Sequence, residues 1–315
     1  MPCLSVESAL RGLTASIIPT ARHPTETLVI QSKKASTTLG TKPICVTIPH
    51  GGPHATSTTA FSPATAALAL EGCESLLQAM QCTPCKHTDP TRADTLSLPN
   101  YTGSMGFGEK YIRKLLGHCG TMDVEDVVES VNELIRLGIS EPGRQVVQGG
   151  SHGGFLAAHR TYPYPSTQLQ RCLHHIFTVI GQYPDLFNAA VMRNPVISVG
   201  DLSGSDIPDW IHSEFGLEFT PETLITPAVY QEVFEASPIA HIDRVRAPVL
   251  LLLGEDDMRV LPTQGMRLYH ALKGREGMVE MLTFPKETHV LDGVEAARVS
   301  WEAGRDWFKA FAEGR

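Results

Sequence analysis

The sequence lacks any apolar run long enough to cross a membrane. A membrane helix needs roughly 18 consecutive apolar residues, and polar or charged residues interrupt every hydrophobic stretch before that length. The amino terminus, MPCLSVESAL, also lacks the basic start and continuous apolar segment of a secretory signal. The sequence therefore predicts a cytoplasmic protein that does not contact a membrane.

Basic residues are in short supply. The 315 residues include 26 lysines and arginines against 34 aspartates and glutamates, which gives a formal net charge of -8 at pH 7. A nucleic-acid surface needs an excess of lysine and arginine to replace the counterions of the phosphates. We therefore expect no nucleic-acid partner.

The seven cysteines form no recognisable framework. Their number is odd and they are scattered, whereas disulfide scaffolds are short chains with regularly spaced, paired cysteines. Cys82 and Cys85 form one CxxC, with His87 two residues later. Zinc would need a matching second pair of ligands, and nothing downstream supplies one. We interpret this segment as a loop and predict no metal.

From residue 43 onward, short apolar segments alternate with amphipathic ones. Residues 123–138 repeat valine, leucine and isoleucine at helical spacing, and a final helix is expected around residues 300–313. Five buried strands are predicted, at residues 43–48, 144–149, 188–192, 248–254 and 278–284. This alternation is typical of a mostly parallel sheet with helices on both faces, so the predicted fold class is α/β.

The strongest local signal is GGSHGG at residues 149–154, which contains G-x-S-x-G around Ser151. It follows a predicted strand and precedes a helical segment, as a nucleophile elbow must. The glycines fit, because side chains there would collide with the neighbouring strand and helix. A glycine- and serine-rich turn before a helix is the simpler alternative, since such short patterns also occur by chance.

A serine hydroxyl needs a base within hydrogen-bond reach to act as a nucleophile near neutral pH. In the α/β-hydrolase fold the nucleophile, the acid and the histidine follow in that order, on loops after strands. His289 follows the last predicted strand through PKETH, and Asp257 follows PVLLLLG through EDD. Spacing alone does not exclude Glu255 or Asp256 as the acid. We predict a triad of Ser151, Asp257 and His289.

Attack on a carbonyl creates an oxyanion, which needs hydrogen-bond donors. One donor is expected from the backbone N–H of His152, the residue after the nucleophile. The other is expected from a loop after an early strand. HGGPH at residues 50–54 follows the first predicted strand and supplies glycines whose amides can approach closely.

These segments, together with several others, resemble the prolyl oligopeptidase family of serine peptidases, and within it the catalytic domain of the acylaminoacyl-peptidases. The resemblance covers roughly residues 43 to 315 and implies the α/β-hydrolase fold. The matching pieces are HGGPH (50–54), NYTGSMGFG (100–108), GGSHGGF (149–155), GQYPD (181–185), RNPV (193–196), SDIPDW (205–210), SPIAHIDRVRAPVLLLLGEDDMRV (237–260) and PKETH (285–289).

The resemblance implies the same triad and assigns the oxyanion donors to the N–H groups of Gly52 and His152. It also implies that Arg259 holds the carbonyl of the substrate's acylated end. A guanidinium suits a blocked amino terminus, which has lost its charge and offers only carbonyl oxygens. A salt bridge to Asp256 or Asp257 is the alternative role for Arg259.

The chain departs from the family pattern in three ways. It has no β-propeller, so we expect residues 1–42 to be a linker or a remnant of an inter-domain connection, and residues 43–315 to be the hydrolase domain. Thr102 stands where the family has arginine. Two segments, about 73–94 and 160–178, look inserted, and prolines in the second would interrupt the helix that should follow the nucleophile, at about 3 kcal/mol each.

The predicted function is a serine peptidase that releases an N-acylated amino acid from the blocked amino terminus of a small peptide through an acyl-enzyme. No cofactor is expected, because a triad and an amide pocket suffice for acyl transfer. The resemblance also implies a possible homo-oligomer. The alternatives are a dipeptidyl-peptidase or carboxylesterase with the same triad, and an inactive truncated fragment that acts as a binding partner.

Overall fold

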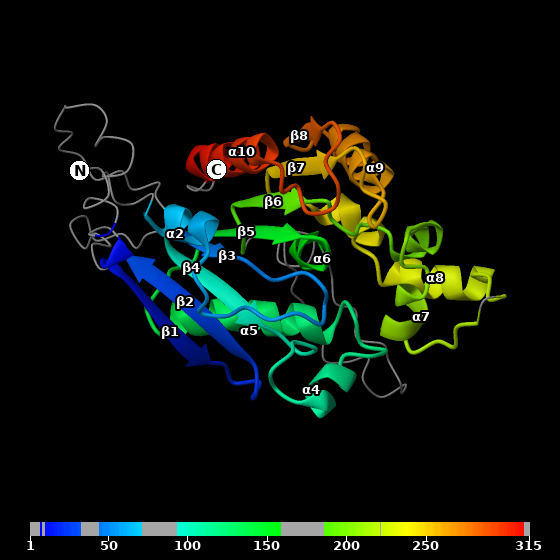
Figure 1. Ribbon diagram of the computed structural model, residues 1–315, viewed down its shortest axis with the longest axis horizontal. Helices are drawn as coiled ribbons and strands as arrows, with labels where there is room; N and C mark the ends of the chain where they lie inside the picture. Colours follow the sequence, from blue (N-terminus) through cyan, green and yellow to red (C-terminus); the bar gives the residue numbers. More distant parts are fainter. Residues whose placement is uncertain are drawn as a thin grey trace.

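The computed structural model describes Glu7 and residues 10–32, 44–70, 93–158, 186–220 and 222–311. Their centre is an eight-stranded sheet with the order β1-β2-β4-β3-β5-β6-β7-β8 (Figure 1). The strands are β1 (Leu13–Pro19), β2 (Glu26–Ser32), β3 (Ile44–Thr47), β4 (Ala93–Asn100), β5 (Gln145–Gly150), β6 (Ala189–Arg193), β7 (Val249–Gly254) and β8 (Val279–Phe284).

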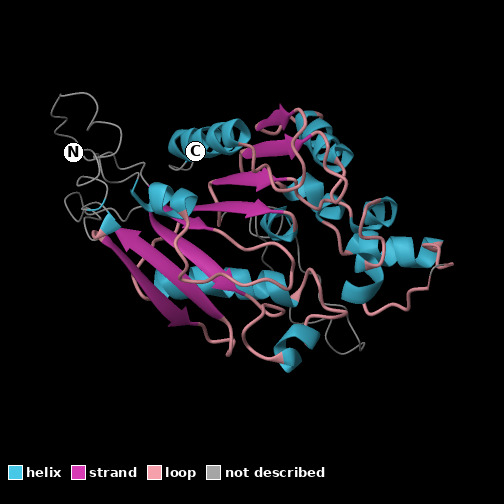
Figure 2. Ribbon diagram, in the orientation of Figure 1, coloured by secondary structure: helices cyan, strands magenta, loops and turns pink. Residues whose placement is uncertain are grey.

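Pairing is antiparallel between β1, β2 and β4, and parallel from β4 across to β8. Helices lie on both sides of this sheet (Figure 2). They are α2 (Pro63–Leu70), α4 (Glu109–Arg113), α5 (Met122–Arg136), α6 (His152–Ala158), α7 (Trp210–Glu214), α8 (Pro227–Glu235), α9 (Pro262–Lys273) and α10 (Val294–Phe311), with 3₁₀ turns η2 (Val199–Gly204) and η3 (Pro238–Arg244). The predicted α/β class, with its mostly parallel sheet, is confirmed.

Two apolar layers hold the sheet, because successive side chains of a strand point to opposite faces. Val147 and Leu251 join the valines of α5 and the apolar residues of α6 and α9 in one layer. Val146 and Leu250, each one position earlier, join Trp307 of α10 and residues of α2 in the other. The central strands are buried on both faces, which explains why they are continuous apolar runs in the sequence.

The amino-terminal region differs from the predicted linker over residues 1–42, because residues 13–32 form the hairpin of β1 and β2 at the edge of the eight-stranded sheet. Most of β1 is exposed, so its sequence carries little periodicity. At the hairpin turn, Arg22 contacts Asp126 at 2.5 Å and Glu125 at 2.8 Å, both on α5. The sheet therefore begins well before the predicted boundary at residue 43.

Asp126 also contacts Thr102, the position at which the resemblance gives arginine. Asp126 is buried, and its Oδ2 accepts the backbone N–H of Thr102 at 2.7 Å, while Oδ1 accepts from Arg22. The guanidinium that neutralises Asp126 therefore comes from the amino-terminal hairpin, and the side chain at position 102 carries no charge.

The first predicted insertion, 73–94, ends inside β4, which begins at Ala93. The rest of it, including the CxxC segment, lies outside the described residues, as does all of 160–178. Of the helices in the described ranges, none has both the length and the apolar character that a membrane-spanning segment requires.

Candidate active site

Ser151 lies at a sharp turn between β5 and α6. Its φ is +56°, a left-handed conformation that a residue with a side chain rarely adopts. Its N–H donates to the carbonyl of Arg193, at the end of the neighbouring strand β6, at 3.0 Å. A Cβ on Gly149 would lie 2.0 Å from the carbonyl oxygen of Gly153, and one on Gly153 would lie 2.3 Å from that of Pro49. The turn is packed so closely that only glycine fits beside the serine.

Asp257 and His289 are brought together by the loops that follow β7 and β8. Asp257 Oδ2 lies 2.7 Å from His289 Nδ1, and Oδ1 accepts the N–H groups of Arg259 and Val260 at 2.8 and 3.0 Å. Asp257 is buried, whereas its neighbour Asp256 is exposed. The geometry thus distinguishes among the candidate acids that spacing left open, because Asp257 is the one that contacts the imidazole.

Ser151 and His289 line one cavity of about 380 Å³, at the carboxyl ends of β3, β5, β6 and β7. Within the described ranges no hydrogen bond joins the two side chains. Such bonds are often long in unliganded sites and tighten when substrate binds. The Asp257 contact uses Nδ1 of His289, so Nε2 is the nitrogen left to exchange a proton.

Asn194 is a residue that sequence reasoning missed. Its Nδ2 donates to the carbonyl oxygens of His289 and Thr288 at 3.0 and 3.3 Å, and its Oδ1 accepts the N–H of Gly254 at 2.9 Å. It is buried and has a φ of +41°, which asparagine tolerates better than most residues. One side chain therefore ties the end of β7 to the histidine loop. In the sequence, the position of this asparagine directly after a buried strand is the one feature that could have indicated its role.

The loop HGGPH lies against the nucleophile. A Cβ on Gly51 would be 3.5 Å from the Cβ of Ser151. The next residue, Gly52, has a φ of +123°, and its carbonyl accepts Nε1–H of Trp210 at 3.3 Å. In the part of the chain that the structure describes, the N–H groups of Gly52 and His152 donate to no other protein group. Both predicted oxyanion donors are thus free to bind an acceptor.

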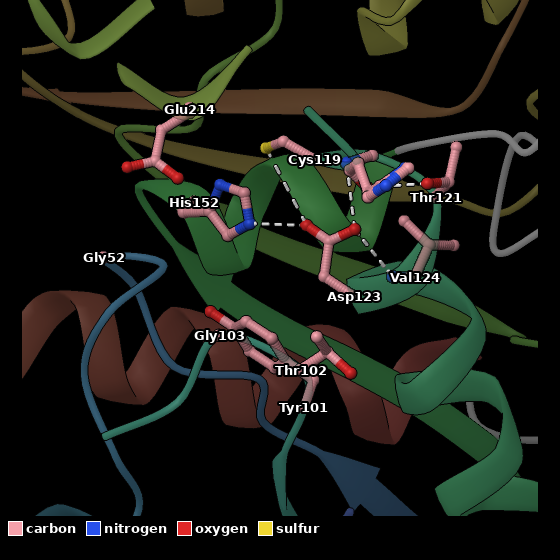
Figure 3. Close-up of polar contacts among 12 residues, drawn as sticks. Gly52, Tyr101, Thr102, Gly103, Cys119, Thr121, Asp123, Val124, His152 and Glu214 are labelled. Atoms are coloured by element: carbon pink, nitrogen blue, oxygen red, sulfur yellow. Dashed lines mark hydrogen bonds and ion pairs between the residues drawn. The ribbon is translucent and has the colours of Figure 1, made fainter. Parts of the chain in front are cut away.

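The imidazole of His152 is buried and fixed by Asp123, whose Oδ2 lies 2.8 Å from its Nε2 (Figure 3). Asp123 Oδ1 accepts the N–H groups of Gly120 and Val124 at 2.9 and 3.0 Å, and the Cys119 thiol lies 3.9 Å from Oδ2. This hydrogen-bond network holds the first residue of α6, the one whose N–H is the predicted oxyanion donor.

Cys119, Asp123 and His152 have their ligand-type atoms within 4.8 Å of one another, which is close enough for three ligands of one metal ion. Donors already occupy the Asp123 oxygens. Burial and the nearby Asp123 raise the pKa of the Cys119 thiol well above its usual range. A metal needs the thiolate. The chemistry of these three groups fits a hydrogen-bond network better than a metal site.

Arg259 pairs with a partner that spacing did not suggest. Its Nε and Nη2 lie 3.3 and 3.2 Å from the two carboxylate oxygens of Asp206, and both side chains are about half exposed. The expected alternative, a side-chain salt bridge to Asp256 or Asp257, is wrong. Arg259 contacts Asp257 only through its backbone N–H.

The segment that carries Asp206 also reaches the HGGPH loop through α7. Trp210 binds the Gly52 carbonyl, and Glu214 lies 3.2 Å from His54 Nε2, whose Nδ1 lies 2.8 Å from the Gly103 carbonyl oxygen. The Glu214 contact raises the pKa of His54. Residues 205–214 thus connect the loop of the predicted acid to the loop of the predicted oxyanion donor.

Comparison with known proteins gives one family and one fold. The model of the prolyl oligopeptidase family matches residues 95–162 and 175–314, so the match leaves out residues 163–174, inside the second predicted insertion. The acylamino-acid-releasing enzyme of Rattus norvegicus is 37% identical over 252 residues, which cover 80% of this chain and 29% of that protein. The enzyme of the same name from Arabidopsis thaliana is 33% identical over 298 residues, 93% of this chain and 33% of that protein. The chain thus spans about a third of the length of these relatives.

Solved structures agree on the fold. A puromycin-hydrolyzing peptidase of Mycobacterium tuberculosis superposes with a TM-score of 0.74 at 23% identity, over 98% of this chain and 41% of that one. The acylaminoacyl peptidase of Pyrococcus horikoshii gives a TM-score of 0.71 at 18% identity, over 96% and 42%. At this identity the likeness shows the shared architecture alone.

Proposed function

The chain belongs to the prolyl oligopeptidase family, as its motifs predict, and from this premise we propose that it is a serine peptidase that releases N-acylated amino acids from the blocked ends of small peptides. The observation that carries the proposal is the 2.7 Å contact between Asp257 and His289, beside a cavity that His289 shares with the Ser151 elbow. Relatives named acylamino-acid-releasing enzymes support the choice of substrate.

In the proposed mechanism, Ser151 Oγ attacks the carbonyl carbon of the acylated residue while His289 Nε2 takes its proton. Asp257 stabilises the imidazolium and holds its tautomer. The N–H groups of Gly52 and His152 stabilise the oxyanion, and each donor is worth about 10²–10³ in rate. His289 then protonates the leaving amine. Water, deprotonated by the same imidazole, cleaves the acyl-enzyme.

Arg259 is proposed to bind the carbonyl of the acyl group. Nε and Nη2 are used by Asp206. A guanidinium has five N–H donors, so three of them, including both on Nη1, are left for a neutral acceptor. Pairing with Asp206 restrains the side chain before substrate arrives and so lowers the entropy cost of binding.

We infer that the peptidase domain includes the hairpin of residues 13–32, because these strands complete its sheet. Small acylated peptides are the proposed partners. The cytoplasmic location, the possible self-association and the lack of a nucleic-acid partner stay predictions from the sequence.

The test is labelling with a fluorophosphonate, which reacts with an activated serine. Wild-type protein is expected to take one label, and Ser151→Ala is expected to take none. Ser203 is an exposed serine outside the site, so the control variant Ser203→Ala is expected to take one label. An unlabelled wild-type protein would favour the inactive fragment. If the wild-type protein takes the label, a separate sample that has not been exposed to the probe is given the anilides of acetyl-alanine and of free-amino dipeptides. Faster turnover of the free-amino dipeptides would reject the proposed substrate in favour of a dipeptidyl-peptidase.

A further inference from the structure

The cavity at Ser151 lies on the sheet face that α2 and α10 cover. Ala64 of α2 and Trp301 of α10 line it together with Ser151. Gly52, Trp210 and Arg259 are described in the structure but do not line it. The cavity is therefore separate from the proposed acyl site at Arg259, and it offers a second place into which a substrate can extend from the nucleophile.

Its lining is mostly apolar and contains no carboxylate. Arg193, the last residue of β6, is the side chain with a permanent charge. His50 also lines the cavity, but burial lowers its pKa to about 4, so its ring is neutral at neutral pH. An anion entering this space would meet one guanidinium and no competing negative charge.

Arg193 lies directly beside the nucleophile turn. A Cβ on Gly150 would lie 3.1 Å from both Nε and Nη2 of Arg193. Among the described residues its guanidinium has no ion pair or hydrogen bond, and desolvation alone shifts its pKa downward. The residue is exposed to solvent, so a ligand can reach its guanidinium. An arginine beside the nucleophile that pairs with no carboxylate among the described residues can bind a ligand carboxylate through its planar set of N–H donors.

The chemistry of the proposed substrate identifies that ligand. An N-acylated peptide has lost the charge of its amino terminus, so its one obligatory charge is the carboxylate at the other end. If the acylated end lies toward Arg259, the leaving portion extends into the cavity. A volume of about 380 Å³ is near the low end of small-ligand pockets, about 300–1,000 Å³, and suits a short leaving group.

We propose that Arg193 binds the C-terminal carboxylate of short N-acylated peptides whose leaving portion occupies this cavity. The proposal rests on the proposed peptidase function and names its substrate class as short acylated peptides with a free carboxyl end. A planar guanidinium can bind a carboxylate through two parallel hydrogen bonds, which a carboxamide cannot match.

The first test compares N-acetyl-trialanine with its C-terminal amide. Wild-type protein is expected to show a kcat/KM at least about tenfold higher for the carboxylate, and Arg193→Gln a ratio near one. The ratio is taken within one protein, so a general loss of activity or folding does not affect it. Arg298→Gln is the matched control: Arg298 lies on α10 and pairs with Glu295 and Glu302, and its loss removes the same charge from the surface. This control is expected to keep the wild-type ratio.

A wild-type ratio near one, or a ratio that survives Arg193→Gln, would overturn the proposal. If neither peptide is cleaved, the peptidase function fails instead, and the subsite is tested by binding. In the Ser151→Ala protein, calorimetry is expected to give a Kd at least about tenfold lower for N-acetyl-trialanine than for its amide. Adding Arg193→Gln should remove that difference. Equal affinities, or no binding of either peptide, would reject the subsite.

Discussion

The side-chain amide of Asn194 donates to the backbone carbonyl of His289 over 3.0 Å, so the end of β6 holds the loop of the proposed base. Asn194 touches none of the proposed reacting atoms and acts as a positioning residue. Hydrogen bonds to the backbone beside a catalytic group set the position of that group, and displacing it by about 1 Å can lower the rate roughly 10²-fold.

Asn194→Ala is expected to lower kcat about 10- to 100-fold with little change in KM, because the base moves while the substrate contacts remain. It also leaves the buried N–H of Gly254 without an acceptor, which should cost about 1–3 kcal/mol of stability. Steady-state kinetics below the unfolding transition separate the two effects. Asn188→Ala removes an amide bonded to the Gly143 carbonyl, far from the site, and should leave kcat unchanged. Equal kcat losses in both variants would show a merely structural role.

Asp257→Asn tests the choice of acid. The carboxamide would favour the wrong tautomer of His289, and kcat should fall by about 10⁴. Asp256→Asn is a close control, because that side chain is exposed and adjacent in sequence. It should keep kcat within about twofold of wild type. A large loss for Asp256→Asn with a small one for Asp257→Asn would transfer the role to the neighbour. Burst and steady-state kinetics with an acetyl-alanine ester provide the measurement.

Gly149→Ala tests the packing of the elbow. Its new Cβ would lie 2.0 Å from the carbonyl oxygen of Gly153, a backbone atom that cannot move without displacing α6. Such overpacking costs about 1–3 kcal/mol or more. We expect a lower midpoint of urea unfolding and a loss of fluorophosphonate labelling under native conditions. At Gly204 a Cβ would meet nothing within 4 Å, so Gly204→Ala should unfold and label like wild type. A Gly149→Ala protein with wild-type stability would contradict the packing argument.

What the sequence could predict was local or ordered along the chain. The Ser151 motif occupies six consecutive residues, and the acid and base follow known strands in a fixed order, so Asp257 and His289 could be named. The contacts that hold these groups are long-range. Asn194 lies 95 residues from His289, and no periodicity links them.

The same limit applies to the fold. The central strands are buried on both faces and stand out as apolar runs, whereas β1 lies at the sheet edge with most side chains exposed. Its assignment depends on pairing with β2 and on the approach of Arg22 to α5, which only the folded chain provides. For the same reason sequence spacing suggests only near neighbours as the alternative salt-bridge partners of Arg259, whereas Asp206 lies 53 residues away.

Arg22→Met tests whether the amino-terminal hairpin is part of the domain. The buried Asp126 carboxylate accepts from Arg22 and from the N–H of Thr102. The substitution removes the first donor and leaves the second. The loss of a charged hydrogen bond predicts a destabilisation of about 1–3 kcal/mol. Equilibrium urea unfolding measures it. Arg11→Met removes an exposed arginine paired with Glu7 and should change stability by less than about 0.5 kcal/mol. Equal effects of the two substitutions would mean that the hairpin is not held through Asp126.

His54 predicts a pH dependence of stability. Contact with the buried Glu214 raises the pKa of His54 in the folded state, so this contact stabilises the protein fully below the unfolded pKa, about 6.5. The stabilisation is lost as the pH rises through the higher folded pKa. The free energy of unfolding should therefore differ more between wild type and His54→Gln at pH 5.5 than at pH 9. His270→Gln, an exposed histidine on α9, should give a difference that does not grow toward low pH. His54 links α7 to the loop of Gly52. If the difference in free energy of unfolding between wild type and His54→Gln instead grows toward pH 9, the neutral ring makes the stabilising contact.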